Sequence, residues 1–109
     1  MNIQTVTVLG AGTMGHGIAH GTISAGYTTR LYDVSDAQLV KARAQIESIL
    51  KKAVELGKAS AADVDAAMAR LTVTSDVKAA LEGTDFIIEA APEKVDLKVK
   101  LFADIDAHA

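Results

Sequence analysis

The chain has 109 residues, 14 acidic and 11 basic, with a formal net charge of −3 and no cysteine. This length suits one domain with one hydrophobic core, the acidic balance argues against a nucleic-acid partner, and the lack of cysteine excludes disulfides and thiolate metal sites. Because its apolar runs fall short of the roughly 20 residues that span a bilayer, and its start lacks the features of a signal peptide, we expect a cytoplasmic protein with no membrane partner.

The first predicted elements are a buried strand and a glycine-rich helix. Residues 3–9 are mostly β-branched and apolar, which is typical of a strand covered on both faces. Gly10 ends this strand, and a helix follows over 13–25. The helix contains several glycines, and each of them costs roughly 1 kcal/mol of helix stability relative to alanine. That cost indicates close packing or the close approach of a ligand.

A second strand and a long helical excursion come next. The strand covers 27–32, and a helix over 35–56 follows, for which Ser35 or Asp36 can act as the cap. The apolar residues of this helix follow the helical period. A further helix over 60–70 begins with a serine cap and an acid near its third position.

Strands and helices continue to alternate to the end of the chain. We predict a strand over 71–74, a helix over 76–81, a strand over 85–90 and a helix over 95–108. This alternation predicts an α/β fold, a Rossmann-type doubly wound parallel sheet with strand order 3-2-1-4 and a long helical excursion between strands 2 and 3. The fourth strand would be an edge, and its apolar centre predicts self-association into a homo-oligomer.

The turn between the first strand and the first helix has a glycine pattern that suits a dinucleotide. Gly10 permits a tight bend, Gly12 lets a pyrophosphate approach the backbone, and Gly15 lets the helix sit close to the strand. Free amides at the helix start then bind phosphate without a lysine. We predict that the whole turn contacts the cofactor: Gly10, Ala11, Gly12, Thr13, Met14 and Gly15.

An acid at the end of the second strand completes this pattern. Asp33 follows the glycines at about the spacing of the dinucleotide fingerprint, roughly 20 residues, and can accept hydrogen bonds from the ribose hydroxyls. Its carboxylate would repel the 2′-phosphate of NADP, and Val34 rather than arginine follows it, so we predict NAD as the cofactor. Two alternatives stay open: Asp33 as a helix cap, and Arg30 turned toward a phosphate.

Four segments form a combination more specific than the glycine turn alone. They are Gly10-Ala-Gly-Thr-Met-Gly-His-Gly-Ile-Ala19, Leu31-Tyr-Asp33, Phe86-Ile-Ile-Glu-Ala-Ala-Pro-Glu93 and Asp96-Leu-Lys-Val-Lys100-Leu-Phe102. Together they resemble the 3-hydroxyacyl-CoA dehydrogenase family, and the resemblance covers essentially the whole chain. It implies an NAD-dependent oxidation of a 3-hydroxyacyl-CoA to a 3-ketoacyl-CoA, as in fatty-acid metabolism, with an acyl-CoA as the substrate partner.

The resemblance also implies roles for individual residues. Asp33 matches the acid that binds the ribose, and Glu93 matches a glutamate near the nicotinamide half of the cofactor. Lys98 matches a lysine that contacts the cofactor from the following helix, and the backbone at Ala91 would pass beside the nicotinamide ribose. From the residues alone, Glu93 is also compatible with stabilising a helix start, and Lys98 with an exposed surface lysine.

Other expected features concern catalysis, coenzyme A and metal. The resemblance places the catalytic histidine and glutamate after a fifth strand that this chain lacks, so we expect 1–109 to be an incomplete NAD-binding domain with no catalytic residue. The long helical pair implies coenzyme-A binding, with Lys51 and Lys52 as candidates for its phosphates; a solvated basic stripe is the alternative. His16 and His20 lie one helical turn apart without a third ligand nearby in sequence, and we predict no metal site.

Three competing functions remain at this stage. The first is the NAD domain of another hydroxyacid or sugar-acid dehydrogenase. A substrate assay would distinguish it from a 3-hydroxyacyl-CoA dehydrogenase. The second is a non-catalytic NAD-binding or redox-sensing module, for which a preference between NADH and NAD linked to partner binding would be the sign. The third is an α/β domain without a ligand, which the glycine turn and Asp33 together disfavour.

Overall fold

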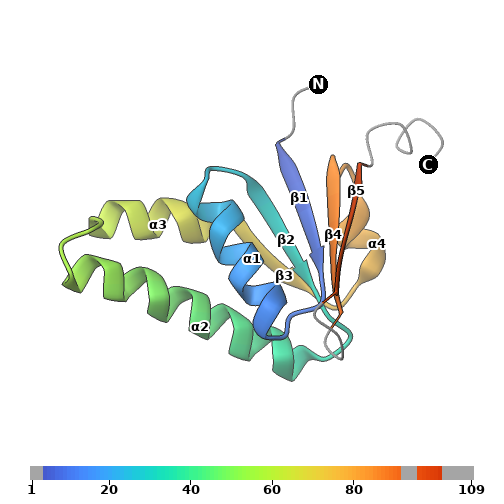
Figure 1. Ribbon diagram of the computed structural model, residues 1–109, viewed down its shortest axis with the longest axis horizontal. Coiled ribbons are helices and arrows are strands. Elements are labelled where there is room, and N and C mark those ends of the chain that lie inside the picture. Colours follow the sequence, from blue (N-terminus) through green and yellow to red (C-terminus); the bar gives the residue numbers. More distant parts are fainter. Residues whose placement is uncertain (1–3, 92–95, 102–109) are drawn as a thin grey trace.

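The computed structural model describes residues 4–91 and 96–101. Its strands form a single sheet in the order β3-β2-β1-β4-β5 (Figure 1). The strands are β1 (Thr5–Leu9), β2 (Thr28–Tyr32), β3 (Leu71–Thr74), β4 (Phe86–Ala91) and β5 (Asp96–Leu101). The helices are α1 (Thr13–Ser24), α2 (Asp36–Glu55), α3 (Ala61–Ala69) and α4 (Val77–Leu81). Strands β1 to β4 are parallel to one another, which confirms the predicted fold class and the order 3-2-1-4.

The sheet is covered by helices on both faces, as its sequence requires. In β1, Val6 and Val8 are buried against the core that includes α1, whereas the intervening Thr7 bonds to α4 on the other face. Successive side chains of a strand point to opposite faces, so α1 and α4 lie on opposite sides of the sheet. A buried apolar cluster joins β1, β2, α1, α2 and α3, and its fully buried members include Val8, Ala19, Ile23, Leu31 and Ile46.

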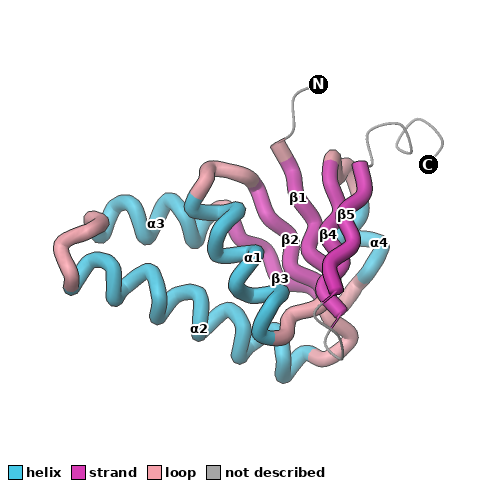
Figure 2. The backbone as a smooth tube through the Cα atoms, viewed as in Figure 1, coloured by secondary structure: helices cyan, strands magenta, loops and turns pink. Residues whose placement is uncertain are grey.

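Helices α2 and α3 form the predicted excursion, a hairpin that extends beyond the sheet (Figure 2). Ser35, one of the two predicted caps, begins α2 because its hydroxyl accepts the amide of Gln38 at 3.2 Å. Ser60 and Asp63 form a reciprocal capping box at the start of α3, as the sequence predicts. The inner face of α2 is apolar at helical spacing and is buried at Leu39, Ala42, Ile46 and Leu50.

Hydrogen bonds from polar side chains of the sheet attach α4 to one of its faces. The Thr7 hydroxyl donates to the Ala80 carbonyl at 2.6 Å and lies 2.8 Å from the hydroxyl of Thr84, and both threonines are fully buried. The Arg30 guanidinium donates to the carbonyls of Ala79, Ala80 and Glu82 at the end of α4, where a cation is favourable. The end of a short helix is thereby fixed to the middle of the sheet.

The predicted helix over 95–108 is wrong where the structure describes it. Residues Asp96–Leu101 form β5, which runs antiparallel to β4, while the rest of that predicted helix lies outside the described residues. The segment Asp-Leu-Lys-Val-Lys-Leu alternates polar and apolar residues, which fits the strand period as well as a helical one. The unpaired edge of β4 offers backbone hydrogen bonds to such a segment, and this tertiary partner decides between the two periods.

The predicted position of β4 at the edge of the sheet is also wrong. β4 lies between β1 and β5, and its whole length from Phe86 to Ala91 is paired with β5. The sheet is therefore mixed, with an antiparallel strand added to an otherwise parallel set. Because β5 covers it, β4 offers no free edge for the predicted self-association.

Candidate cofactor-binding site

The glycine turn between β1 and α1 is shaped by contacts within the protein. Gly10 has a positive φ of 108°, and a Cβ there would lie 2.5 Å from the Ala90 carbonyl oxygen. Its amide donates to the Tyr32 carbonyl at 2.7 Å, which joins the turn to the end of β2. A Cβ on Gly15 would lie 1.7 Å from the Gly10 carbonyl oxygen. The fold itself therefore requires glycine at both positions.

Gly12 differs from these two glycines. A Cβ built at Gly12 would meet no protein atom within 4 Å, so packing does not demand glycine there. Gly12 directly precedes α1 and is its N-cap residue, so this open space lies at the start of that helix. This is the geometry expected if the residue leaves room for a ligand group, as the fingerprint predicts for its second glycine.

The first turn of α1 is free of side-chain caps. Gly12 has no side chain to accept a hydrogen bond, and the first turn contains no acid. In contrast, α2, α3 and α4 begin at Ser35, Ser60 and Asp76, whose side chains accept first-turn amides. The amides at Thr13, Met14 and Gly15 thus lack a side-chain acceptor and carry the partial positive charge of the helix start. Such a helix start is suited to an anion like pyrophosphate.

Asp33 lies beside this helix start and connects it to α2. One carboxylate oxygen accepts the amide of Ala11 at 2.9 Å, and the other accepts the amide of Ser35 at 2.9 Å. The cap of α2 is Ser35 rather than Asp33, so the capping alternative does not explain the contact with Ala11. Each carboxylate oxygen keeps a further lone pair, which leaves capacity to accept from ribose hydroxyls.

The Arg30 side chain is directed to α4 and not to the glycine turn. Its guanidinium is held by the carbonyls at the end of α4, so the alternative in which it turns toward a cofactor phosphate has no support in this structure. The charged group next to the turn is the Asp33 carboxylate, which favours ribose hydroxyls over a 2′-phosphate.

The remaining predicted contacts come from the end of β4 and from β5. Ala91 is the last residue of β4 and follows Ala90, whose carbonyl oxygen approaches Gly10. The backbone at Ala91 therefore lies near the glycine turn, while its contact with the nicotinamide ribose stays a prediction. Glu93 lies outside the described residues. Lys98 was expected on a helix but lies in β5, at the position paired with Glu89 of β4.

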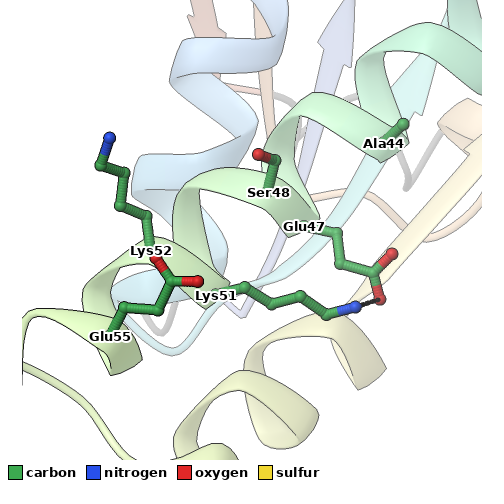
Figure 3. A pocket seen from close by; sticks show the side chains of 6 residues that line it. All are labelled: Ala44, Glu47, Ser48, Lys51, Lys52 and Glu55. Atoms are coloured by element: carbon green, nitrogen blue, oxygen red, sulfur yellow. Dashed lines mark ion pairs between the residues drawn. The ribbon is translucent and has the colours of Figure 1, made fainter.

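The candidate coenzyme-A residues lie on the exposed side of α2. Lys51 and Lys52 line a shallow hollow of about 370 Å³ together with Ala44, Glu47, Ser48 and Glu55 (Figure 3). The Lys51 ammonium lies 3.9 Å from a carboxylate oxygen of Glu47, one helical turn away. Charges of both signs alternate along this stripe, which supports the alternative of a solvated helix face for Lys51.

Two residues outside the predicted site also contact the turn. Ala90 approaches both glycines: its Cβ would lie 3.7 Å from a Cβ at Gly10 and 3.8 Å from one at Gly15. His16 lies within hydrogen-bond distance of the Gly12 carbonyl, with its ring Nδ1 at 3.1 Å. The Gly12–His16 spacing of one helical turn was the available signal for the second contact.

These features define a dinucleotide-binding domain of the Rossmann type, with its site at the carboxyl ends of the parallel strands. The family described as 3-hydroxyacyl-CoA dehydrogenase, NAD binding domain, matches residues 5–109. The chain belongs to this family, which confirms the resemblance and identifies NAD as the cofactor of the domain.

Individual relatives agree with this assignment. The chain is 40% identical over 105 residues to 3-hydroxyadipyl-CoA dehydrogenase of Escherichia coli K12, a match that covers 96% of this chain and 22% of that protein. It is 36% identical over 104 residues to 3-hydroxybutyryl-CoA dehydrogenase of Mycobacterium tuberculosis, covering 95% of this chain and 36% of the other. A crystal structure of 3-hydroxybutyryl-CoA dehydrogenase from E. coli K12 superposes with a TM-score of 0.81 at 40% identity, over 86% of this chain and 20% of that one.

The chain is thus much shorter than these relatives and spans between about a fifth and two fifths of their length. Within the described residues, no cluster of three or more His, Cys, Asp or Glu side chains is arranged to hold a metal ion. None of the described helices combines the length and apolar character needed to cross a membrane.

Proposed function

We propose that the 109-residue chain binds NAD at the carboxyl edge of its sheet and acts as the cofactor-binding part of an enzyme that oxidises a 3-hydroxyacyl-CoA to the 3-ketoacyl-CoA. The nicotinamide ring supplies the hydride acceptor for this oxidation. The observation that carries the proposal is the Asp33 carboxylate, bonded to the Ala11 amide next to a helix start without a side-chain cap.

In this proposal, the chain's own residues bind and orient the NAD cofactor. The first-turn amides of Thr13, Met14 and Gly15 hold the pyrophosphate, and Asp33 holds the adenosine ribose. The backbone at Ala91, together with Glu93 and Lys98, contacts the nicotinamide half. Removal of the hydroxyl proton needs a general base, and we assign none of the chain's residues to that task.

The proposal also covers the substrate, the oligomeric state and the location of the protein. We infer an acyl-CoA as the substrate because the relatives named above act on hydroxyacyl-CoA compounds. We also propose a homo-oligomer, formed through a surface other than the β4 edge that β5 covers. We propose a cytoplasmic location as well, in keeping with the absence of cysteine. Residues 1–109 would form one NAD-binding domain in this arrangement.

The test is a calorimetric titration of the chain with NAD and with NADP, beside an Asp33→Ala variant. We expect NAD to bind the wild type more tightly than NADP, and the variant to lose that preference along with much of its affinity. Removal of hydrogen bonds to a charged group costs about 1.5–3 kcal/mol, which corresponds to a loss of roughly 10- to 150-fold.

Asp36→Ala is the matched control, because Asp36 is an exposed acid three residues away in the first turn of α2. It should leave the NAD affinity unchanged. Equal NAD affinity of Asp33→Ala and wild type would exclude Asp33 as the ribose ligand. A folded wild type that binds no NAD would contradict the proposed function as a whole.

A further inference from the structure

The ring of His16 turns back to Gly12, the N-cap residue of α1. Its Nδ1 lies 3.1 Å from the Gly12 carbonyl oxygen, and the backbone amide of His16 donates to the same oxygen at 2.9 Å. A carbonyl oxygen only accepts hydrogen bonds, so Nδ1 is the nitrogen that carries the proton. The Gly12 carbonyl is therefore held by two donors from one residue.

This double contact fixes a peptide unit that the cofactor site uses. The Gly12 carbonyl and the Thr13 amide belong to the same peptide plane, and in a trans peptide they point in opposite directions. Holding the carbonyl toward the helix therefore holds the Thr13 N–H outward, at the start of α1. That amide is one of the first-turn donors with the partial positive charge of the helix start.

The start of α1 needs such support more than the other helix starts. Ser35, Ser60 and Asp76 stabilise α2, α3 and α4 by accepting first-turn amides, whereas Gly12 has no side chain to do so. A cap of that kind on α1 would occupy the amides that a phosphate requires. The glycines within α1 weaken it further, by about 1 kcal/mol each relative to alanine. His16 stabilises the helix start from its carbonyl side and leaves the amides free.

We propose that His16 is a positioning residue for the cofactor pyrophosphate, acting through the Gly12 carbonyl to present the Thr13 amide. This inference rests on the proposed NAD site. Neither the glycine fingerprint nor the acid at the end of β2 assigns a role to the residue at position 16.

The test compares His16→Ala, His16→Ser and His20→Ala in the 109-residue chain. A serine hydroxyl in a helix can donate to the carbonyl four residues earlier, so His16→Ser restores the bond to Gly12 that His16→Ala removes. His20 lies one turn further from the helix start and, like His16, is half-buried, which makes it the matched control. The measurements are NAD affinity by calorimetry and the NMR order parameter of the Thr13 N–H in the free protein, which reports how firmly that amide is held.

We expect His16→Ala to weaken NAD binding roughly three- to tenfold, the equivalent of one net hydrogen bond, and to lower the order parameter of the Thr13 N–H. His16→Ser and His20→Ala should bind NAD at the wild-type level. A purely structural role would lower the melting temperature of His16→Ala without changing the NAD affinity of the folded protein.

Unchanged NAD affinity in His16→Ala, or a serine variant that behaves like the alanine variant, would overturn the inference while leaving the proposed function intact. If His16→Ala does not fold, a wild-type order parameter at Thr13 in His16→Ser supports the inference, and a lower one overturns it. A folded wild type that binds no NAD would overturn both the proposed function and this inference.

Discussion

Gly12 and Gly15 occupy the same turn, but the protein tolerates a side chain at only one of them. A Cβ on Gly15 would lie 1.7 Å from a backbone oxygen, whereas a Cβ on Gly12 would meet no protein atom within 4 Å. We expect Gly15→Ala to destabilise the fold by about 3 kcal/mol or more, because the neighbouring atom is backbone and cannot rotate away. Gly12→Ala should cost about 1 kcal/mol or less, as the loss of a favoured residue at a helix start, and should weaken NAD binding.

Thermal unfolding and NAD titration of the two variants check this pair of expectations. The informative result is a separation of the two effects: lost stability in Gly15→Ala, and lost affinity with retained stability in Gly12→Ala. If Gly12→Ala binds NAD like the wild type, the space beside Gly12 is not used by the cofactor.

At the scale of single residues, the sequence predicted which residue types make up the candidate site but not which hydrogen bonds they form. The glycines and Asp33 follow from a local pattern, because a tight turn and a ribose acceptor need particular residues at particular spacing. The bond from Ala11 to Asp33 depends on where the end of β2 lies relative to the turn, which is a tertiary fact. The contact of His16 with Gly12 depends on a side-chain rotamer that the sequence leaves open.

Among the elements, β1 and β4 are joined at their amino ends by one aspartate. A carboxylate oxygen of Asp85 accepts the amides of Gln4 and Thr5, both at 3.0 Å, and these bonds hold the pKa of Asp85 below its usual range. A lowered pKa in the folded state contributes stability above the unfolded-state pKa of about 3.9, and this contribution is lost as the pH falls through the folded-state value.

We therefore expect Asp85→Asn to be less stable than the wild type at neutral pH, and the difference to shrink as the pH falls below about 4. Urea unfolding over a pH series measures it, with Asp65→Asn as the control because Asp65 is an exposed aspartate of α3. A stability difference that stays constant down to the acid limit would show that the charge of Asp85 does not strengthen the link to β1.

Most of the helices and strands could be predicted from local sequence signals, whereas the conformation of one segment depends on its tertiary partner. Caps and periodic apolar faces predicted α2 and α3, because Ser35 and the Ser60–Asp63 box act within a few residues of the chain. The β-branched core of β1 likewise predicted a buried strand. The segment 96–101 carries both a helical and an alternating pattern, and only the edge of β4 selects the strand.

For the whole molecule, β5 determines which edge of the sheet is open. β4 is apolar at its centre, and β5 covers its full length in the antiparallel register. Successive amides of a strand point alternately to its two sides, so proline at both position 98 and position 99 removes at least one amide that faces β4. Proline also disfavours continued pairing in a sheet.

We expect the double variant Lys98→Pro, Val99→Pro to release β5 and to increase self-association through the uncovered β4 edge. Light scattering over a range of protein concentrations measures it, and Thr72→Pro in the outer strand β3 is a control that disturbs the sheet at its opposite edge. An increase confined to the β5 variant would show that β5 protects an adhesive edge. If the β5 variant keeps the wild-type mass at every concentration, an open β4 edge does not drive association, and any oligomer must form through another surface.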